Sequence, residues 1–148
     1  MNIPPEVIAK SLSGFCICYF KNATHDPEAP PHYHVTIPIS DDSSLLLCLV
    51  TSQVENKAWY YKKTNANALA SLVTANKSSL SFLKKESIID CNQPLHVHKS
   101  KFDKIVDPDH NFKVVSRNIP DDLKKRIVDA VKASPIVKPF IKKMITWP

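Results

Sequence analysis

The sequence predicts an α+β domain in which helices are inserted around a small, strongly bent antiparallel sheet or β-barrel. Three observations predict this class: five to seven short segments have the composition of strands, helical segments lie between them, and the carboxyl-terminal part is helical. That combination is typical of α+β folds. The length of 148 residues fits a single domain spanning residues 1–148. We expect an amino-terminal helix in 1–13, a core in 14–134 and a helical tail in 135–148.

The first elements are a short helix and a buried strand. Residues 4–12 suit a helix because proline is tolerated in a first helical turn, and Gly14 ends it. The apolar run 15–19 predicts a buried strand. Residues 21–31 are rich in proline, asparagine and aspartate and predict a loop. A loop held between two strands is a common place for functional residues.

A hairpin is expected in the middle of the chain. Residues 32–39 and the fully apolar run 45–50 predict two strands, with a turn at Asp41 and Asp42. A third strand is expected over 59–62. Apolar residues at helical spacing then predict a helix over 64–73.

The second half of the chain predicts further short strands and two helices. Strands are expected over 81–83, 86–91, 95–98 and 112–116, with a turn at 92–94 and a helical turn at 101–106. The clearest helix is 120–133, because its apolar residues recur at helical spacing, acidic residues occupy its first turn and Lys132 lies in its last. A short helix over 136–145 follows.

A single glycine, Gly14, excludes several classes of nucleotide-binding protein. An average chain of this length would contain roughly ten glycines at about 7% usage. P-loops, dinucleotide fingerprints and G-x-S-x-G nucleophile elbows each need at least two. Any phosphate must therefore be met by side chains rather than by a bare glycine backbone.

The net charge of +6 favours a polyanionic partner such as nucleic acid. Only Arg117 and Arg126 are arginines, so bidentate guanidinium contacts are scarce. The other explanation is solvated lysine on helix faces. The same two explanations apply to Lys138, Lys142 and Lys143 of the tail, which either dock a partner or form a solvated face.

The cysteines and the apolar segments predict a cytoplasmic protein with no membrane contact. No apolar run has the length of a membrane helix or of a signal-peptide core. The 4 cysteines lie within or beside apolar runs, without the spacing of a zinc ribbon. We expect them to be reduced and buried.

Two histidine pairs raise the question of a metal. His32 and His34, like His96 and His98, are two residues apart and would share one face of a strand. Two such pairs could supply four ligands. However, short H-x-H patterns also arise by chance, and no acidic or cysteine ligand lies at a recognisable offset, so no metal cofactor is predicted.

The histidines also suggest a phosphoesterase. His34-x-Thr36 and His98-x-Ser100 are two H-x-[T/S] elements, and they resemble the two-histidine phosphoesterases that act on cyclic phosphates and RNA ends. Two histidines can serve as general base and acid across a phosphodiester. This is the alternative enzyme class.

A broader resemblance rests on four segments in order. These are P-H-Y-H-V-T-I-P-I at 31–39, L-L-L-C-L-V-T-S at 45–52, K-E-S-I-I-D-C at 85–91, and the helix introduced by proline and acidic residues at 119–133. Over roughly residues 14–134 the chain resembles the PemK/MazF-like toxins.

That resemblance implies an SH3-like barrel with inserted helices, usually a homodimer, and a cognate antitoxin as partner. It implies a ribonuclease that cuts single-stranded RNA without a metal. Thr51 and Ser52 match the positions that contact the scissile phosphate. The family's arginine before the central hairpin has no counterpart in 21–31, so Lys21, His25 or His32 would take its place.

The residues themselves suit this chemistry. Cleavage of RNA by its own 2′-hydroxyl needs a base, an acid and a positive charge near the phosphate. His25 or His32 could be the acid or base, Lys21 the charge, and Thr51 and Ser52 hydrogen-bond donors.

A surface for bases is expected beside the hairpin. Trp59, Tyr60, Lys62 and Lys63 interleave aromatic and basic side chains, as RNA-stacking surfaces do. The other explanation is that Trp59 and Tyr61 are core. A third class of function is a barrel that binds nucleic acid or protein without catalysis.

Overall fold

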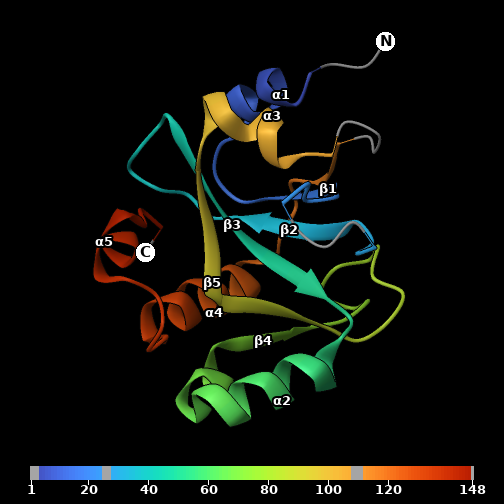
Figure 1. Cartoon of the computed structure of the whole chain (residues 1–148), viewed down its shortest axis with the longest axis vertical. Coiled ribbons are helices and arrows are strands. Elements are labelled where there is room, and N and C mark those ends of the chain that lie inside the picture. The colour runs from blue at the N-terminus through green and yellow to red at the C-terminus, as the bar shows by residue number, and fades with distance from the viewer. Residues whose placement is uncertain (1–3, 25–27, 108–111, 148) are drawn as a thin grey trace.

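The computed structural model describes residues 4–24, 28–107 and 112–147, and it contains an antiparallel sheet with helices on both faces (Figure 1). Six strands are ordered β4-β5-β3-β2-β1-β6, and every pairing is antiparallel. The predicted α+β class is confirmed. The helices and strands are α1 (Pro5–Ser11), β1 (Cys16–Phe20), β2 (His32–Thr36), β3 (Ser44–Thr51), α2 (Val54–Thr64), η1 (Ala66–Ser71), β4 (Leu72–Ala75), β5 (Ser87–His98), η2 (Lys99–Lys101), α3 (Phe102–Ile105), β6 (Lys113–Ser116), α4 (Asp121–Ala133) and α5 (Pro139–Met144).

Alternate strand residues face two apolar clusters, one on each side of the sheet. In β1, Ile17 joins the cluster that contains the apolar face of α4. Cys16, Cys18 and Phe20 join the cluster that contains residues of α1 and α3. Because both faces are covered, β3 is apolar at nearly every position, as a strand buried on two sides requires.

The sheet is open, so the expected closed barrel is wrong. Its edges are β4 and β6, each of 4 residues, and they do not pair with each other in the described part of the chain. The β4 edge instead meets α4, where Arg126 Nη2 donates to the carbonyl and hydroxyl oxygens of Thr74 at 3.1 and 3.0 Å. Barrel closure would require the two edge strands to pair through backbone hydrogen bonds, and the short edge strand β4 contacts a side chain of α4 instead.

The expected strand at 59–62 is also wrong, because this segment lies in α2. Lys57 and Tyr61, one helical turn apart, both reach Asp90 of β5. Trp59 and Tyr60 between them are exposed. This spacing of inward residues is that of a helix rather than of a strand. The helix expected over 64–73 is likewise replaced by η1 and β4.

One long, bent strand, β5, replaces the two strands and the turn that the sequence suggested. Between its pairs with Leu47 and Leu49, β5 runs from residue 95 to 90, three residues further than β3. Figure 1 shows the strand bending within its length. Asn92 lies in this irregular stretch, donating to the Ala68 carbonyl at 2.9 Å and accepting from the Ser134 hydroxyl at 2.7 Å. Because these hydrogen bonds satisfy the buried Asn92 amide within the protein, the chain continues as a strand instead of turning towards solvent.

The predictions for Gly14 and for the cysteines are confirmed. Gly14 follows α1 with a φ of +67°, the left-handed conformation that favours glycine. All four cysteines are buried and free of disulfides. Among the described residues, no helix is both long and apolar enough to span a bilayer. The tail helix α5 is shorter than expected, and Lys142 donates to the Ser134 carbonyl at 2.7 Å.

Candidate functional site

The candidate site is a cavity of about 650 Å³ where β3 ends. We call it the Thr51 cavity; it is lined by residues 19, 30–33, 50–53, 82–85 and 87. Three of the predicted catalytic residues meet in it: His32, Thr51 and Ser52. They come from the start of β2 and the end of β3, which the hairpin brings side by side.

Thr51 and Ser52 form the turn from β3 into α2. Thr51 is 5% exposed, and its Oγ1 accepts a hydrogen bond from the backbone N–H of Gln53 at 3.1 Å. This bond uses a lone pair and leaves the hydroxyl proton available as a donor. Ser52 is exposed. Thr51 therefore has a structural role at the start of α2 as well as a place in the cavity.

The three proposed substitutes for the missing arginine are placed differently. His32 begins β2, pairs in register with Phe20, and lines the cavity with Pro30 and Pro31. Lys21 is not among the lining residues, and its ammonium lies 4.0 Å from the Asp107 carboxylate. His25 lies outside the described residues. Of the two that lie within the described residues, His32 is the one that the structure brings into the same cavity as Thr51 and Ser52.

Two lysines in the cavity were missed by sequence reasoning. Lys84 and Lys85 line it from the segment between β4 and β5, and both are exposed. This segment contains turns rather than the strand expected over 81–83. Leu80 and Leu83 anchor it in the core, which leaves the following lysines at the surface. The adjacent lysine pair before the 86–91 strand was the available signal.

Three aromatic rings stand in a row at the cavity. Tyr19 and Tyr33 are cross-strand partners whose ring centroids are 4.7 Å apart, and Phe82 lies 4.6 Å from Tyr33. All three line the Thr51 cavity. Aromatic faces beside cations are the parts from which single-strand binding surfaces are made.

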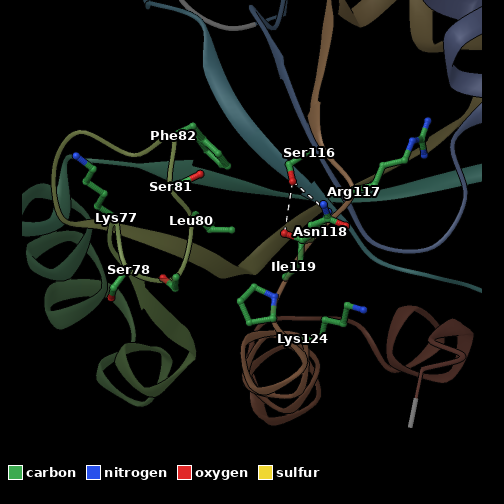
Figure 2. Close-up of a pocket in the computed structure, with 12 residues that line it drawn as sticks. Lys77, Ser78, Leu80, Ser81, Phe82, Ser116, Arg117, Asn118, Ile119 and Lys124 are labelled. Carbon is green, nitrogen blue, oxygen red and sulfur yellow. Dashed lines mark hydrogen bonds between the residues drawn. The ribbon is translucent and has the colours of Figure 1, made fainter.

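A second cavity has a volume of about 530 Å³, and Figure 2 shows the residues that line it. We call it the Ser116 cavity; it is lined by residues 77–82, 116–120 and 124. Phe82 belongs to both cavities. One wall comes from the segment between β4 and β5, and the other comes from the end of β6, the residues that follow it and the first turn of α4.

The lining of the two cavities is strongly cationic. Among the described residues that line them, the charged ones are all basic: Lys77, Lys84, Lys85, Arg117 and Lys124. The whole chain has 14 acidic and 20 basic residues. Because none of the acidic residues lines these walls, the two cavities have a local excess of positive charge. A cleft lined by one sign of charge attracts ligands of the opposite sign.

The expected RNA surface on α2 is exposed but separate. Trp59 and Tyr60 are 62% and 45% exposed, and the Lys63 ammonium lies 5.2 Å from the Trp59 ring centroid. Lys62 is exposed beside them. The alternative that Trp59 is core is wrong, whereas Tyr61 is buried as that alternative held. None of these residues lines either cavity.

A buried polar cluster lies where α2 meets β5. Asp90 is 2% exposed; it accepts from the Tyr61 hydroxyl at 2.7 Å and lies 3.5 Å from the Lys57 ammonium. Burial and then the hydrogen bond to Asp90 raise the pKa of Tyr61 far above its usual range. The phenol therefore stays protonated and donates to the carboxylate, which ties α2 to β5.

The two H-x-[T/S] elements do not form one site. His34 is 4% exposed and stacks on Phe20 with ring centroids 4.1 Å apart, and the Thr36 hydroxyl donates to the Gly14 carbonyl at 2.9 Å. His98 instead accepts from the Ser100 N–H at 3.3 Å and caps η2.

The sheet register keeps these histidines apart. His34 pairs with Leu49 of β3, whereas His98 pairs with Ser44 on the other side of that strand. Five residues along β3 separate the two pairs, roughly 17 Å at about 3.4 Å a residue. The described residues also contain no group of three histidine, cysteine or acidic side chains that could hold a metal.

In comparisons with known proteins, the sequence matched no family model and no curated protein.

Proposed function

We propose that the protein is a metal-independent endoribonuclease that cuts single-stranded RNA in the Thr51 cavity. The observation that carries the proposal is that His32, Thr51 and Ser52 share one cavity with Lys84 and Lys85. A proton acceptor, hydroxyl donors and positive charge therefore line the same cavity. These are the groups that cleavage by the RNA 2′-hydroxyl requires.

The reaction follows from these roles. The 2′-oxygen attacks the neighbouring phosphorus while His32 takes its proton. Ser52 and Thr51 donate to the phosphoryl oxygens, and Lys84 and Lys85 offset the charge that develops on them. The bond from phosphorus to the 5′-oxygen breaks, and this oxygen takes a proton from solvent. His32 then releases to solvent the proton that it took from the 2′-hydroxyl. The products are a 2′,3′-cyclic phosphate and a 5′-hydroxyl.

The resemblance to PemK/MazF-like toxins extends this proposal. It adds a homodimer, a cognate antitoxin and a cytoplasmic setting. The structure supports one step of it, because the threonine–serine pair after the second hairpin strand faces the same cavity as the residues before the first. Lys84 and Lys85 supply the positive charge in place of the family's arginine.

The test is cleavage of end-labelled single-stranded RNA in EDTA by the purified protein. We expect products with 5′-hydroxyl and cyclic phosphate ends. Ser52→Ala should slow cleavage at least tenfold, because it removes a donor to the transition state. Lys85→Gln tests the positive charge that offsets the developing charge on the phosphoryl oxygens. Its matched control is Lys132→Gln, which replaces an exposed lysine on α4 outside both cavities.

Two outcomes would overturn the proposal. RNA that is bound but not cut would replace the enzyme by a binding module. Cleavage that persists unchanged in Ser52→Ala and in Lys85→Gln would place the chemistry elsewhere in the protein.

A further inference from the structure

The Ser116 cavity joins two segments that are distant in sequence. Residues 77–82 form one wall, and residues 116–120 with Lys124 form the other (Figure 2). Its volume of about 530 Å³ is within the range of sites that hold small organic ligands. It is therefore large enough to take a nucleotide-sized group next to the one in the Thr51 cavity.

The inner walls combine apolar and neutral polar groups. In Figure 2, Leu80 and Phe82 extend into the gap from one side, opposite Ser116 and Ile119. The N–H of Asn118 donates to the Ser116 hydroxyl at 3.0 Å, which holds the opposite wall in a tight turn. The Asn118 side-chain amide, on an exposed residue, makes no hydrogen bond within the described part of the chain. Such an amide can both donate to and accept from the edge of a base.

The cations lie at the rim rather than in the gap. Figure 2 shows the charged ends of Lys77 and Arg117 extending away from it on opposite sides. Lys124 is engaged with Asp121 at 3.4 Å and lies over the Phe15 ring. A neutral interior with a cationic rim suits a ligand whose flat apolar part enters while its phosphates stay outside.

Phe82 connects the two cavities. Its ring belongs to both linings and continues the row of Tyr19 and Tyr33. Bases that stack on aromatic rings gain free energy whatever their sequence, and a strand that enters one cavity can continue into the next along such a row.

We propose that the Ser116 cavity binds the base of a nucleotide that flanks the one at Thr51 and Ser52, on the same RNA strand. Asn118 contacts the edge of this base, Phe82 stacks against it, and Arg117 meets a phosphate at the rim. This inference rests on the proposed function, since it extends the same substrate across a second subsite.

The test is binding of fluorescent 2′-O-methyl RNA oligonucleotides of randomised sequence, which cannot be cut. Fluorescence anisotropy in EDTA would compare a labelled 2′-O-methyl mononucleotide with an octanucleotide. The wild-type protein should bind the octanucleotide more tightly, because this ligand reaches both subsites. Asn118→Ala should reduce that advantage at least fivefold and leave mononucleotide binding unchanged. Asn67→Ala, an exposed asparagine on η1 outside both cavities, is the matched control.

Two further variants sharpen the result. Phe82→Ala should weaken octanucleotide binding about tenfold. Phe82→Trp retains a stacking ring and should restore most of that loss, which separates stacking from damage to the fold. Arg117→Gln should lower the slope of affinity against salt by about one ion.

The outcomes distinguish this inference from the proposed function. If the wild type binds neither ligand and cuts no RNA, the proposed function fails and this inference with it. If it cuts RNA in the Thr51 cavity but Asn118→Ala and Phe82→Ala match the wild type with both ligands, only the second subsite is overturned.

Discussion

Two polar regions of opposite character lie near the end of β3. In the Thr51 cavity, Ser52 and the two lysines are exposed, and Lys84 and Lys85 make no ion pair within the described part of the chain. In the second region, Asp90 and Tyr61 are buried and bonded to each other. The described residues contain no buried side-chain polar atom without a partner.

The difference follows from the cost of burial. A polar group removed from water must find a partner in the chain, so it becomes part of the fold. A polar group left at an open cavity can exchange water for a ligand instead. Substitutions in the first region should therefore change binding or catalysis, and those in the second should change stability.

Asp90→Ala should have the largest effect on the free energy of unfolding. It leaves the buried Tyr61 hydroxyl without its acceptor and the Lys57 ammonium without its carboxylate. We expect a loss of about 3 kcal/mol, measured by urea denaturation followed by circular dichroism. Tyr61→Phe removes only the hydroxyl and should cost less, about 1–2 kcal/mol. Equal midpoints for Asp90→Ala and the wild type would show that the cluster is not structural.

His32→Gln should show the opposite pattern. Loss of the proton acceptor should reduce RNA cleavage by about a hundredfold or more, because general base catalysis has that magnitude. The free energy of unfolding should change by less than about 1 kcal/mol, since the side chain is half-buried at a cavity wall. Cleavage and urea denaturation would be measured on the same preparation.

His98→Gln is the matched comparison for that histidine. It lies on an exposed part of β5 far from the Thr51 cavity, and cleavage should remain at the wild-type level. If His98→Gln abolished cleavage while His32→Gln did not, the assignment of the base would be wrong.

These two regions also show how far the sequence can be interpreted. The hairpin, the apolar β3 and the helix α4 were predictable, because their apolar residues repeat at the period of one element. The threonine–serine pair lies in the Thr51 cavity because it forms the end of β3 and the residue after it. Trp59 to Lys62 misled, because aromatic residues suit strands and only the tertiary contact with Asp90 shows which of them face inward.

Long-range contacts explain the other differences. Asn92 and Pro94 indicated a turn, but Ala68 and Ser134 satisfy the buried Asn92 amide and let β5 continue. The Ser116 cavity was not predictable, because residues 77–82 and 116–120 are distant in sequence and come together only when the sheet forms. The equal spacing of the two H-x-H pairs likewise did not predict how β2 and β5 align with β3. This alignment places the two histidine pairs on opposite sides of β3 and at different positions along it.

Asp41→Asn should produce the smallest effect, and it tests the opposite end of β3. Asp41 accepts from the Ser43 hydroxyl and N–H at 2.7 and 3.0 Å and from the Ser44 hydroxyl at 2.7 Å. The Ser43 hydroxyl bond first, followed by the other two, lowers the pKa of Asp41 to about 2. The turn before β3 thus favours the ionised carboxylate.

The lowered pKa of Asp41 determines how its contribution to stability changes with pH. Because the folded pKa lies below the usual value of 3.8, the ionised Asp41 stabilises the fold above about pH 4, and this contribution is lost as the pH falls towards 2. The thermal midpoint of Asp41→Asn should therefore lie slightly below that of the wild type at pH 7, and the difference should shrink between about pH 4 and pH 2. Asp42→Asn, at the exposed neighbouring position, controls for the loss of a charge. A difference that stayed constant with pH in this range would show that the hydrogen bonds of Asp41 do not depend on its ionisation, and that only the buried end of β3 is anchored by a carboxylate.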